Sequence, residues 1–169
     1  GKRPERVLDE GFPIYGAGGI SGYTSKYLVD NSYTIIIARV GVGSVGKVYL
    51  AQGKVWINDN ALYLVVNEKE VHPVFLFYVL VHQKLDRFAR RGAGGYAVLT
   101  QSTLKSMPIA LPPLEEQVII AETLSSIDKW LELEIKYKEN LEKIKHSLMN
   151  LLVTGTVRVV VEKEYESAG

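Results

Sequence analysis

The feature that most constrains this chain is an uninterrupted run from Leu114 to Leu152 that contains neither glycine nor proline. Pro112 and Pro113 precede it, and proline suits the start of a helix because the first turn leaves its backbone N–H groups unpaired anyway. Gly155 follows it, and glycine is the usual residue just after a helix C-terminus. About 39 residues at about 1.5 Å each give a rod of roughly 58 Å. The run therefore predicts one helix that is too long for a small domain to cover.

Apolar residues recur along this helix at steps of three and four, which marks one face. We expect that face to pack on a second helix, through Leu124, Ile127, Leu131, Leu141, Ile144, Leu148 and Leu151. The seven-residue repeat of a coiled coil is interrupted. If Ile120 and Ile127 are a positions, Glu134 is the next one. A surface helix that lies across its own domain is the alternative interpretation.

The composition changes at the two prolines. Residues 1–113 hold 13 Lys and Arg against 8 Asp and Glu, whereas residues 114–169 hold 7 against 11. The first part is rich in Gly, Tyr, Val and Ile, and the second in Leu, Glu, Lys and Ile. We therefore predict a compact domain at 1–111, a long helix at 112–153 and a C-terminal tail at 154–169.

The first part shows the patterns of a mixed domain. Short runs rich in β-branched and aromatic residues predict strands at 33–40, 45–50 and 61–66, and residues 109–111 predict a further short strand. Residues 72–91 predict a helix, because Pro73 suits a first turn and several apolar residues share one face. The expected fold class is α+β, a compact mixed α/β domain followed by one long helix.

Gly41, Gly43 and Gly46 satisfy the G-x-G-x-x-G spacing of a dinucleotide-binding loop. Such a loop must be followed by a helix whose N-terminus faces the phosphates, but residues 45–50 predict a strand. We therefore expect a hairpin in which glycine supplies positive φ. An alternative use of the same small residues is to let the backbone come close to a nucleic-acid phosphate.

A second glycine-rich stretch, residues 92–95, lies among basic, aromatic, hydroxyl and amide side chains. Such a mixture is typical of a DNA-contacting surface. The residues we predict to contact DNA are Arg39, Lys47, Arg90, Arg91, Gln101 and Ser102, with Tyr23 and Lys26 as lesser candidates. Arginine can pair with guanine and glutamine with adenine in the major groove. A solvated helix end with a flexible loop is the alternative interpretation of residues 84–105.

Several classes of function lack support. Cysteine is absent, which excludes disulfide scaffolds, thiolate metal sites and cysteine nucleophiles. The three histidines are widely spaced, so we expect no zinc site. Asp59, between two asparagines, predicts a turn rather than a catalytic group. No apolar run reaches the roughly 18 residues of a membrane helix. Because no signal-peptide pattern is present, we expect a cytoplasmic protein.

Five segments together carry a resemblance to a known family: IYGAGGISGY at 14–23, IIIARVGVGSVGKV at 35–48, WINDNALYL at 56–64, LPPLEEQ at 111–117 and LLVTGTVR at 151–158. In this order they resemble the DNA specificity (S) subunit of type I restriction–modification systems. The resemblance covers roughly residues 11–160.

This resemblance implies a target recognition domain that reads double-stranded DNA, followed by a spacer helix. It implies no catalysis by the chain itself. Its partners would be methyltransferase (M) subunits, which use S-adenosylmethionine, and a restriction (R) subunit, so S-adenosylmethionine, ATP and Mg²⁺ would belong to those partners. Family members usually carry two recognition domains and two helices that pack antiparallel, whereas this sequence has one of each. We therefore expect either a half subunit that forms a homodimer through its helix, as an antiparallel coiled coil, or a fragment of a longer chain.

Two other classes of function stay open at this stage. One is a coiled-coil adaptor or dimerisation protein that does not bind DNA. The other is a nucleotide-binding enzyme that uses the loop at Gly41–Lys47.

An antiparallel dimer would place two recognition domains some 50–60 Å apart by the rod length, and one turn of B-DNA is about 34–36 Å. We therefore predict a palindromic, bipartite target with half-sites between one and two turns apart. Lengthening the helix by one turn should lengthen the unread gap between the half-sites. Mapping of methylated adenines checks this, and an unchanged gap would contradict it.

Overall fold

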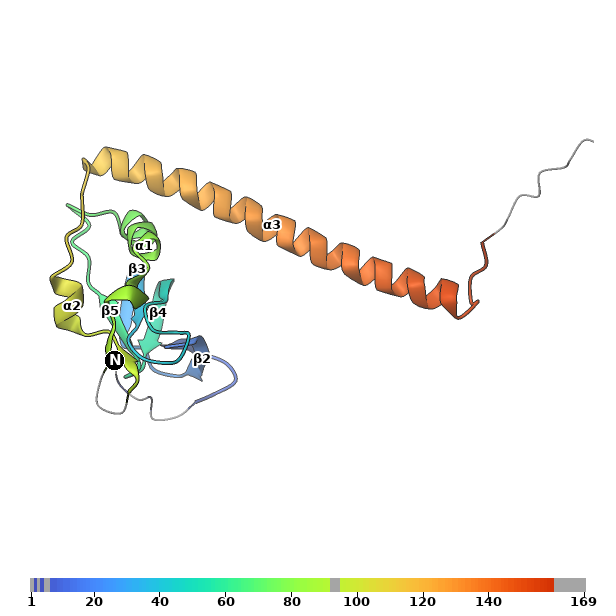
Figure 1. Cartoon of the computed structure of the whole chain (residues 1–169), viewed down its shortest axis with the longest axis horizontal. Helices are drawn as coiled ribbons and strands as arrows, with labels where there is room; N and C mark the ends of the chain where they lie inside the picture. The colour runs from blue at the N-terminus through green and yellow to red at the C-terminus, as the bar shows by residue number, and fades with distance from the viewer. Residues whose placement is uncertain (1, 3, 5–6, 92–94, 160–169) are drawn as a thin grey trace, which may run out of the picture. The chain divides into compact units, whose positions relative to one another are not determined.

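The computed structural model describes residues 2, 4, 7–91 and 95–159 of the 169-residue chain (Figure 1). The chain divides into two units, residues 1–124 and residues 125–169, and each is treated by itself below. Strands and short helices form the first unit, together with the first residues of the long helix. The second unit consists of the rest of that helix and the segment that follows it.

A five-stranded sheet forms the framework of the first unit, with its strands in the order β2-β1-β4-β3-β5. The strands are β1 (Phe12–Gly16), β2 (Gly19–Thr24), β3 (Val29–Ala38), β4 (Val48–Ile57) and β5 (Ala61–Leu64). Neighbouring strands are antiparallel except β1 and β4, which run parallel. β4 is long enough to pair with β3 along most of its length and with β1 at its C-terminal end.

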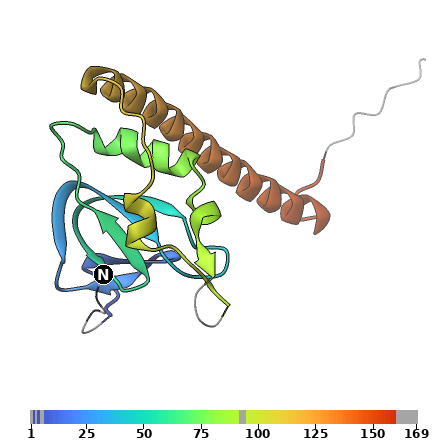
Figure 2. The ribbon, with the colours of Figure 1, turned by 60° about the vertical axis from the view of Figure 1, so that its left-hand side comes forward.

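Smaller elements follow the sheet along the chain: α1 (Pro73–His82), the 3₁₀ helix η1 (Leu85–Phe88), β6 (Arg90–Arg91), β7 (Ala97–Val98) and α2 (Gln101–Lys105). Figure 2 shows α1 and α2 on the same side of the sheet. The two-stranded ribbon β6–β7 is separate from the main sheet.

The core is organised around three successive isoleucines of β3, which are all fully buried. Because side chains alternate along a strand, Ile35 and Ile37 lie on one face and Ile36 on the other. Ile35 and Ile37 belong to a cluster with buried leucines of α1 and η1. Ile36 packs with residues of β4 and β5, and three half-buried tyrosines line that second cluster. A fully apolar run is thus explained by a strand that is covered on both faces.

The three predicted strands of the first unit exist, with shifted ends. β3 covers most of 33–40, β5 covers most of 61–66, and β4 begins at Val48 and continues to Ile57, well beyond residue 50. The predicted strand at 109–111 is wrong, because these residues are in no strand. The β1–β2 hairpin was not expected, since its glycines interrupt the alternating pattern on which strand prediction depends.

The helix predicted at 72–91 is too long. α1 ends at His82, and Lys84 adopts a positive φ of 50°, which no α-helix continues through. The chain then turns through η1 and buries Leu85 completely in the core. Burial of a leucine side chain favours folding by about 1.5–3 kcal/mol, which offsets the roughly 1–2 kcal/mol cost of a left-handed residue. Sequence periodicity does not report this balance between backbone strain and tertiary packing.

The long helix, α3, spans Leu114–Val153 and confirms the prediction for residues 114–152. Glu115 and Glu116 lie in its first turn, where the helix dipole favours negative charge. Gly155, with φ of +73°, follows its end, and its backbone N–H donates to the carbonyl of Leu152. In the first unit Ala121 of α3 is buried against Val74 and Phe75 of α1.

A single buried amide fixes the start of α3 in the first unit. Gln117 is 1% exposed. Its Oε1 accepts from the backbone N–H of His72 at 2.9 Å, and its Nε2 donates to the carbonyls of Glu70 at 3.1 Å and Pro112 at 2.8 Å. The side chain therefore links backbone groups of two segments, the one before α1 and the one before α3.

Replacing this amide should destabilise the first unit. Gln117→Leu keeps similar bulk but leaves one backbone N–H and two carbonyls without partners, at about 1–3 kcal/mol for such unpaired buried groups. We expect a loss of about 2–4 kcal/mol in the free energy of unfolding, measured by urea denaturation. Lys129→Leu makes a polar-to-apolar change at an exposed position of the same helix and should change it by less than about 0.5 kcal/mol. Equal effects of the two substitutions would contradict the role assigned to Gln117.

Candidate nucleic-acid interface

Three connections between strands of the first unit contact one another, and together they are called the loop cluster: residues 17–18, residues 39–47 and residues 58–60. The hydroxyl of Tyr49, at the start of β4, donates to the carbonyl of Ala17 at 3.0 Å. A Cβ added to Gly41 would lie 3.6 Å from that of Ala17. The first two connections are therefore neighbours.

The third connection is a turn built by asparagine. Asn58 accepts the backbone N–H of Asn60 on its side-chain Oδ1 at 2.9 Å, which is an Asx-type turn around Asp59. The carbonyl of Asn60 accepts a hydrogen bond from the backbone N–H of Arg39 at 3.0 Å. The backbone N–H of Asn58 donates to the carbonyl of Tyr15 at 2.9 Å. The expectation that Asp59 lies in a turn is confirmed, and this turn joins residue 39 to the end of β1.

Glycine allows the 39–47 loop to lie directly against η1. Gly41, Gly43 and Gly46 all have positive φ, of 110°, 71° and 82°. A Cβ on Gly46 would overlap the backbone of Leu85 and Asp86. β4, rather than a helix, follows the loop, so the geometry of a phosphate-binding G-x-G-x-x-G motif is absent from this segment. The predicted hairpin is confirmed, because the loop joins the antiparallel strands β3 and β4.

The ribbon β6–β7 and the start of α2 adjoin the same loop. The backbone N–H of Leu99 donates to the carbonyl of Arg39 at 2.8 Å. Thr100 then caps α2, since its Oγ1 accepts the backbone N–H of Thr103 at 3.2 Å. Gln101 and Ser102 are the first two residues of this short helix and are exposed.

The structure brings six of the eight predicted DNA-contacting residues onto connected segments. Arg39 and Lys47 lie at the two ends of the loop, Arg90 and Arg91 form β6, and Gln101 and Ser102 open α2. All of these are exposed except Arg39, which is half-buried and whose Nε is a buried atom without a hydrogen-bond partner. Gln101 also lines a largely apolar cavity of about 350 Å³ between the sheet, α1 and α2.

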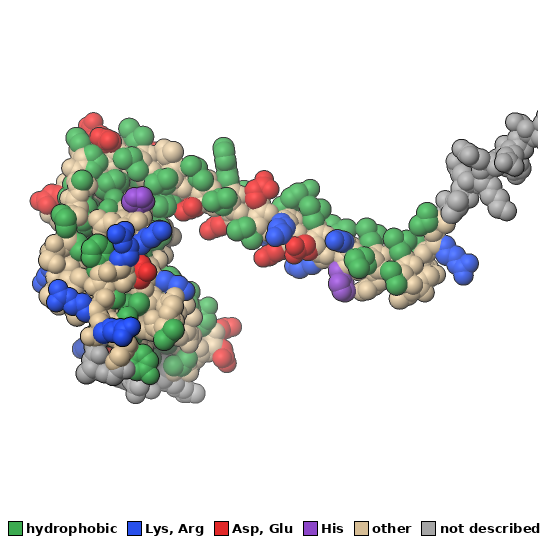
Figure 3. Space-filling model, viewed as in Figure 1, with side chains coloured by type: hydrophobic (Ala, Val, Ile, Leu, Met, Phe, Trp, Pro, Cys, Tyr) green, Lys and Arg blue, Asp and Glu red, His purple; other side chains and the backbone are tan. Residues whose placement is uncertain are grey.

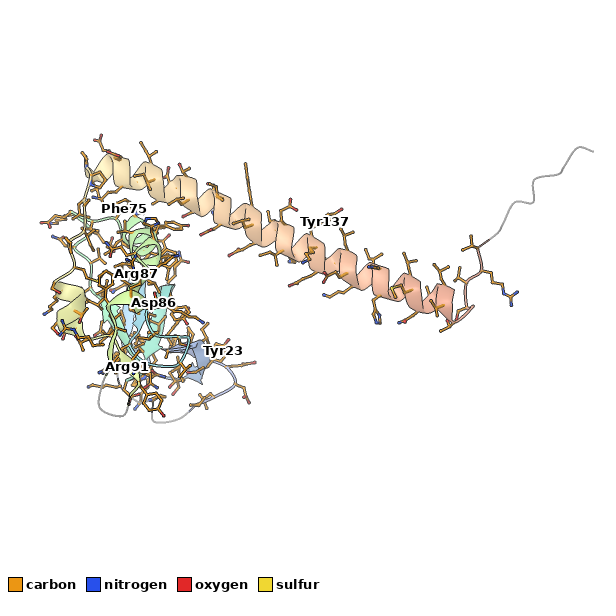
Figure 4. The ribbon with its side chains drawn as sticks, in the orientation of Figure 1. Tyr23, Phe75, Asp86, Arg87, Arg91 and Tyr137 are labelled. Atoms are coloured by element: carbon orange, nitrogen blue, oxygen red, sulfur yellow. The ribbon has the colours of Figure 1, made fainter. Side chains whose placement is uncertain are left out.

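Tyr23 and Lys26 lie on a different segment. Tyr23 is near the end of β2, about 13 Å along the strand from Gly19, and its backbone pairs in both directions with Leu8. The backbone N–H of Lys26 donates to Thr24 Oγ1 at 3.4 Å. In Figure 4 Tyr23 projects from β2, away from Arg87 and Arg91.

Charge and tyrosine chemistry at the surface both suit a polyanion. Figure 3 shows Lys and Arg side chains on the face that carries α2, η1 and β6. Burial raises the pKa of Tyr49, and burial together with the neighbouring Tyr23 raises the pKa of Tyr15. A tyrosine with its ordinary pKa is already neutral at physiological pH, so these upward shifts leave both phenols uncharged beside the loop cluster.

Sequence reasoning missed two contributors to this surface. Arg87, on η1, is exposed beside the backbone that Gly46 contacts, but the overlong predicted helix hid its position. Asn60 anchors the backbone of Arg39. The Asn-Asp-Asn turn was visible in the sequence, but its proximity to residue 39 depends on the pairing of β3 with β5.

Comparison with known proteins connects these loops to a family. The model of the type I restriction modification DNA specificity domain matches residues 3–143. The chain belongs to this family. Within it, the chain is 38% identical over 139 residues to a putative type I restriction enzyme MjaX specificity subunit from Methanocaldococcus jannaschii. It is 36% identical over 148 residues to the MjaVIII specificity subunit of the same organism.

Each of these alignments covers 81% of this chain but only 32% and 34% of the relatives. This specificity domain therefore spans about a third of the length of the curated relatives it matches. Solved structures agree in fold. The crystal structure of a type I restriction–modification S subunit from M. genitalium superposes with a TM-score of 0.67 at 25% identity, over 89% of this chain and 41% of that one. A second structure, from work on assembly of the type I system, gives a TM-score of 0.59 at 18% identity.

Two further findings concern metal binding and membrane insertion. Within the described ranges, His, Cys, Asp and Glu form no group of three or more that could hold a metal ion. None of the helices in the described part of the chain combines the length and apolar content that a bilayer span requires.

Gly46 and Gly43 lie in the same loop, but only Gly46 is packed against η1, so substitutions at the two positions should differ in their effect on stability. Gly46→Ala places a methyl group into the backbone of η1, so we expect a loss of more than about 2 kcal/mol in the free energy of unfolding. Gly43→Ala has a similar φ but open space around it, so it should cost only about 1 kcal/mol. Thermal or urea denaturation measures both, and equal losses would show that contact with η1 contributes nothing.

Proposed function

We propose that this chain is the DNA-recognising part of a type I restriction–modification specificity subunit and that it reads one half of a bipartite target. The observation that carries the proposal is the meeting of three strand connections with β6 and α2, which gathers exposed basic and amide side chains on one surface. Exposed arginines and lysines neutralise phosphates, and the amide and hydroxyl groups of Gln101 and Ser102 suit base edges. Family membership supports this assignment of the surface.

In this proposal the chain performs no catalysis. A methyltransferase (M) subunit supplies adenine methylation with S-adenosylmethionine, and a restriction (R) subunit supplies ATP-driven translocation and cleavage. α3 serves as the spacer and as the docking element for these subunits. Its apolar side chains between residues 127 and 151 are exposed in this chain, as expected of a helix that another helix covers in the assembly.

A protein-only adaptor is the second candidate, and that same exposed helix favours it. The two functions differ in their response to salt. Phosphate contacts release counterions, so the affinity of a DNA-binding complex falls steeply as salt rises. An adaptor would show no DNA binding of this kind.

Mapping adenine methylation across the host genome, with and without the gene, tests the proposal directly. Loss of one bipartite motif would establish the specificity role, and a palindromic motif would add the homodimer. An asymmetric motif would mean that a second recognition domain is supplied elsewhere. An unchanged map, with the system expressed and no duplicate gene, would favour the adaptor.

The role of β6 can be measured in the assembled complex. Arg90→Ala with Arg91→Ala removes two exposed cations, so affinity for target DNA should fall at least tenfold, by about 1–3 kcal/mol per base-contacting arginine. If both arginines contact phosphates instead, the slope of log K against log salt concentration should become less steep by about two. Lys69→Ala removes an exposed cation from the segment before α1 and should leave both quantities unchanged.

A further inference from the structure

The cavity of about 350 Å³ between the sheet, α1 and α2 is called the edge pocket. Eight of its eleven lining residues are Ile, Leu or Met, and the other three are Tyr63, Gln101 and Lys105. Pockets that bind small molecules measure about 300–1,000 Å³ and combine an apolar lining with a few placed polar groups. The edge pocket therefore has the size and the lining of a site for one small ligand.

The pocket lies at a free edge of the five-stranded sheet. β5 is the last strand of that sheet and pairs only with β3. The backbone N–H of Ala38 donates to the carbonyl of Lys47, so Ala38, and Ile36 two residues before it, direct their backbone groups toward β4. Ile36 is the partner of Tyr63 in β5. The backbone N–H and C=O of Tyr63 therefore point away from β3, toward the open side of the sheet.

These two backbone groups are what Tyr63 presents to the pocket. The Tyr63 side chain packs in the cluster of Ile36, on one face of the sheet, whereas Leu64 packs in the cluster of α1 on the other face. Since α1 and α2 close the pocket on that second face (Figure 2), Tyr63 lines it with its backbone. Within the described ranges no residue hydrogen-bonds to this N–H or C=O. The pocket thus holds one unused donor and one unused acceptor side by side.

The shape of this edge favours a single ring over an added strand. The backbone N–H of Ala61 is already bonded to the carbonyl of Asn58 at 3.2 Å, and β5 ends at Leu64. An added strand would therefore find paired backbone groups at Tyr63 alone. A planar ring with an adjacent donor and acceptor needs no more than that. The edge of a nucleobase has this pattern, as in adenine, where the N6 amino group lies beside the N7 acceptor.

Charge at the solvent side of the pocket calls for an anion. Lys105 and Gln101 are both exposed there, and none of the lining residues is acidic. Lys105 forms no ion pair with any other residue that the structure describes. A lysine ammonium binds phosphate as a point charge. An apolar slot, a free backbone edge and one cation together match a base that carries a phosphate.

We propose that the edge pocket binds a free mononucleotide, with its base against the backbone of Tyr63 and its phosphate beside Lys105. The site is separate from the loop at Gly41–Lys47 and involves no catalysis. It goes beyond the DNA-reading role proposed above and does not depend on it. The base lies among the aliphatic side chains of β5, α1 and α2, where burial of its faces adds to the two hydrogen bonds.

Isothermal titration of the full chain with AMP and its fragments tests the chemistry of the ligand. We expect AMP to bind with a Kd on the order of 10–100 µM. Adenosine lacks the phosphate, and purine riboside 5′-monophosphate lacks the amino donor, so each should bind about tenfold more weakly. Ribose 5-phosphate, which has no base, should give no detectable heat.

Substitutions in the pocket test its location. Lys105→Ala should weaken AMP about tenfold but leave the Kd of adenosine unchanged, because only AMP carries the phosphate. Lys26→Ala removes an exposed cation just after β2, at the opposite edge of the sheet, and should change neither. Leu104→Trp fills the pocket and should abolish AMP binding, whereas Ile20→Trp, exposed on β2, should not. Thermal unfolding verifies that each variant is folded.

Four results would overturn the proposal. The first is the absence of heat with AMP at millimolar concentration. The second is equal binding of ribose 5-phosphate and AMP, which would mean attraction by charge alone. The third is AMP binding that persists in folded Leu104→Trp, which would place the ligand elsewhere. The fourth is a loss of single-stranded oligonucleotide binding in that variant without any AMP binding to the unchanged chain, which would mean that the pocket takes an unpaired nucleotide of a nucleic acid. The methylation map judges the specificity role separately.

Discussion

The hydrogen bonds of Gln117 are the constraint on which the rest of the architecture depends. This buried amide joins the backbone before α1 to the backbone before α3 and to the first turn of α3 itself. Without it, the packing of Ile120 and Ala121 on α1 would remain as the contact that holds the start of the helix in the first unit.

The loop cluster depends on a different kind of constraint, which is close backbone approach. Gly46 lets the 39–47 loop lie on η1, and the backbone of Arg39 is held from both sides by Asn60 and Leu99. The scaffold thus fixes the main chain while Lys47, Arg90 and Arg91 keep exposed side chains. A fixed backbone with exposed side chains suits the DNA-reading role proposed for this surface, since side chains at the surface can change without loss of the core.

The sequence by itself determined the elements that depend on local physics. The long helix follows from the absence of glycine and proline and from its three-and-four spacing, and the central strand follows from the run Ile35–Ile37. Only the tertiary structure decided the rest. α1 stops at His82 because burying Leu85 outweighs a left-handed Lys84, a balance that no periodicity reports. Arg39, Arg90 and Gln101 come onto one surface because β6 pairs with β7 and the backbone N–H of Leu99 donates to the carbonyl of Arg39. Pairings between distant segments are not encoded in local pattern.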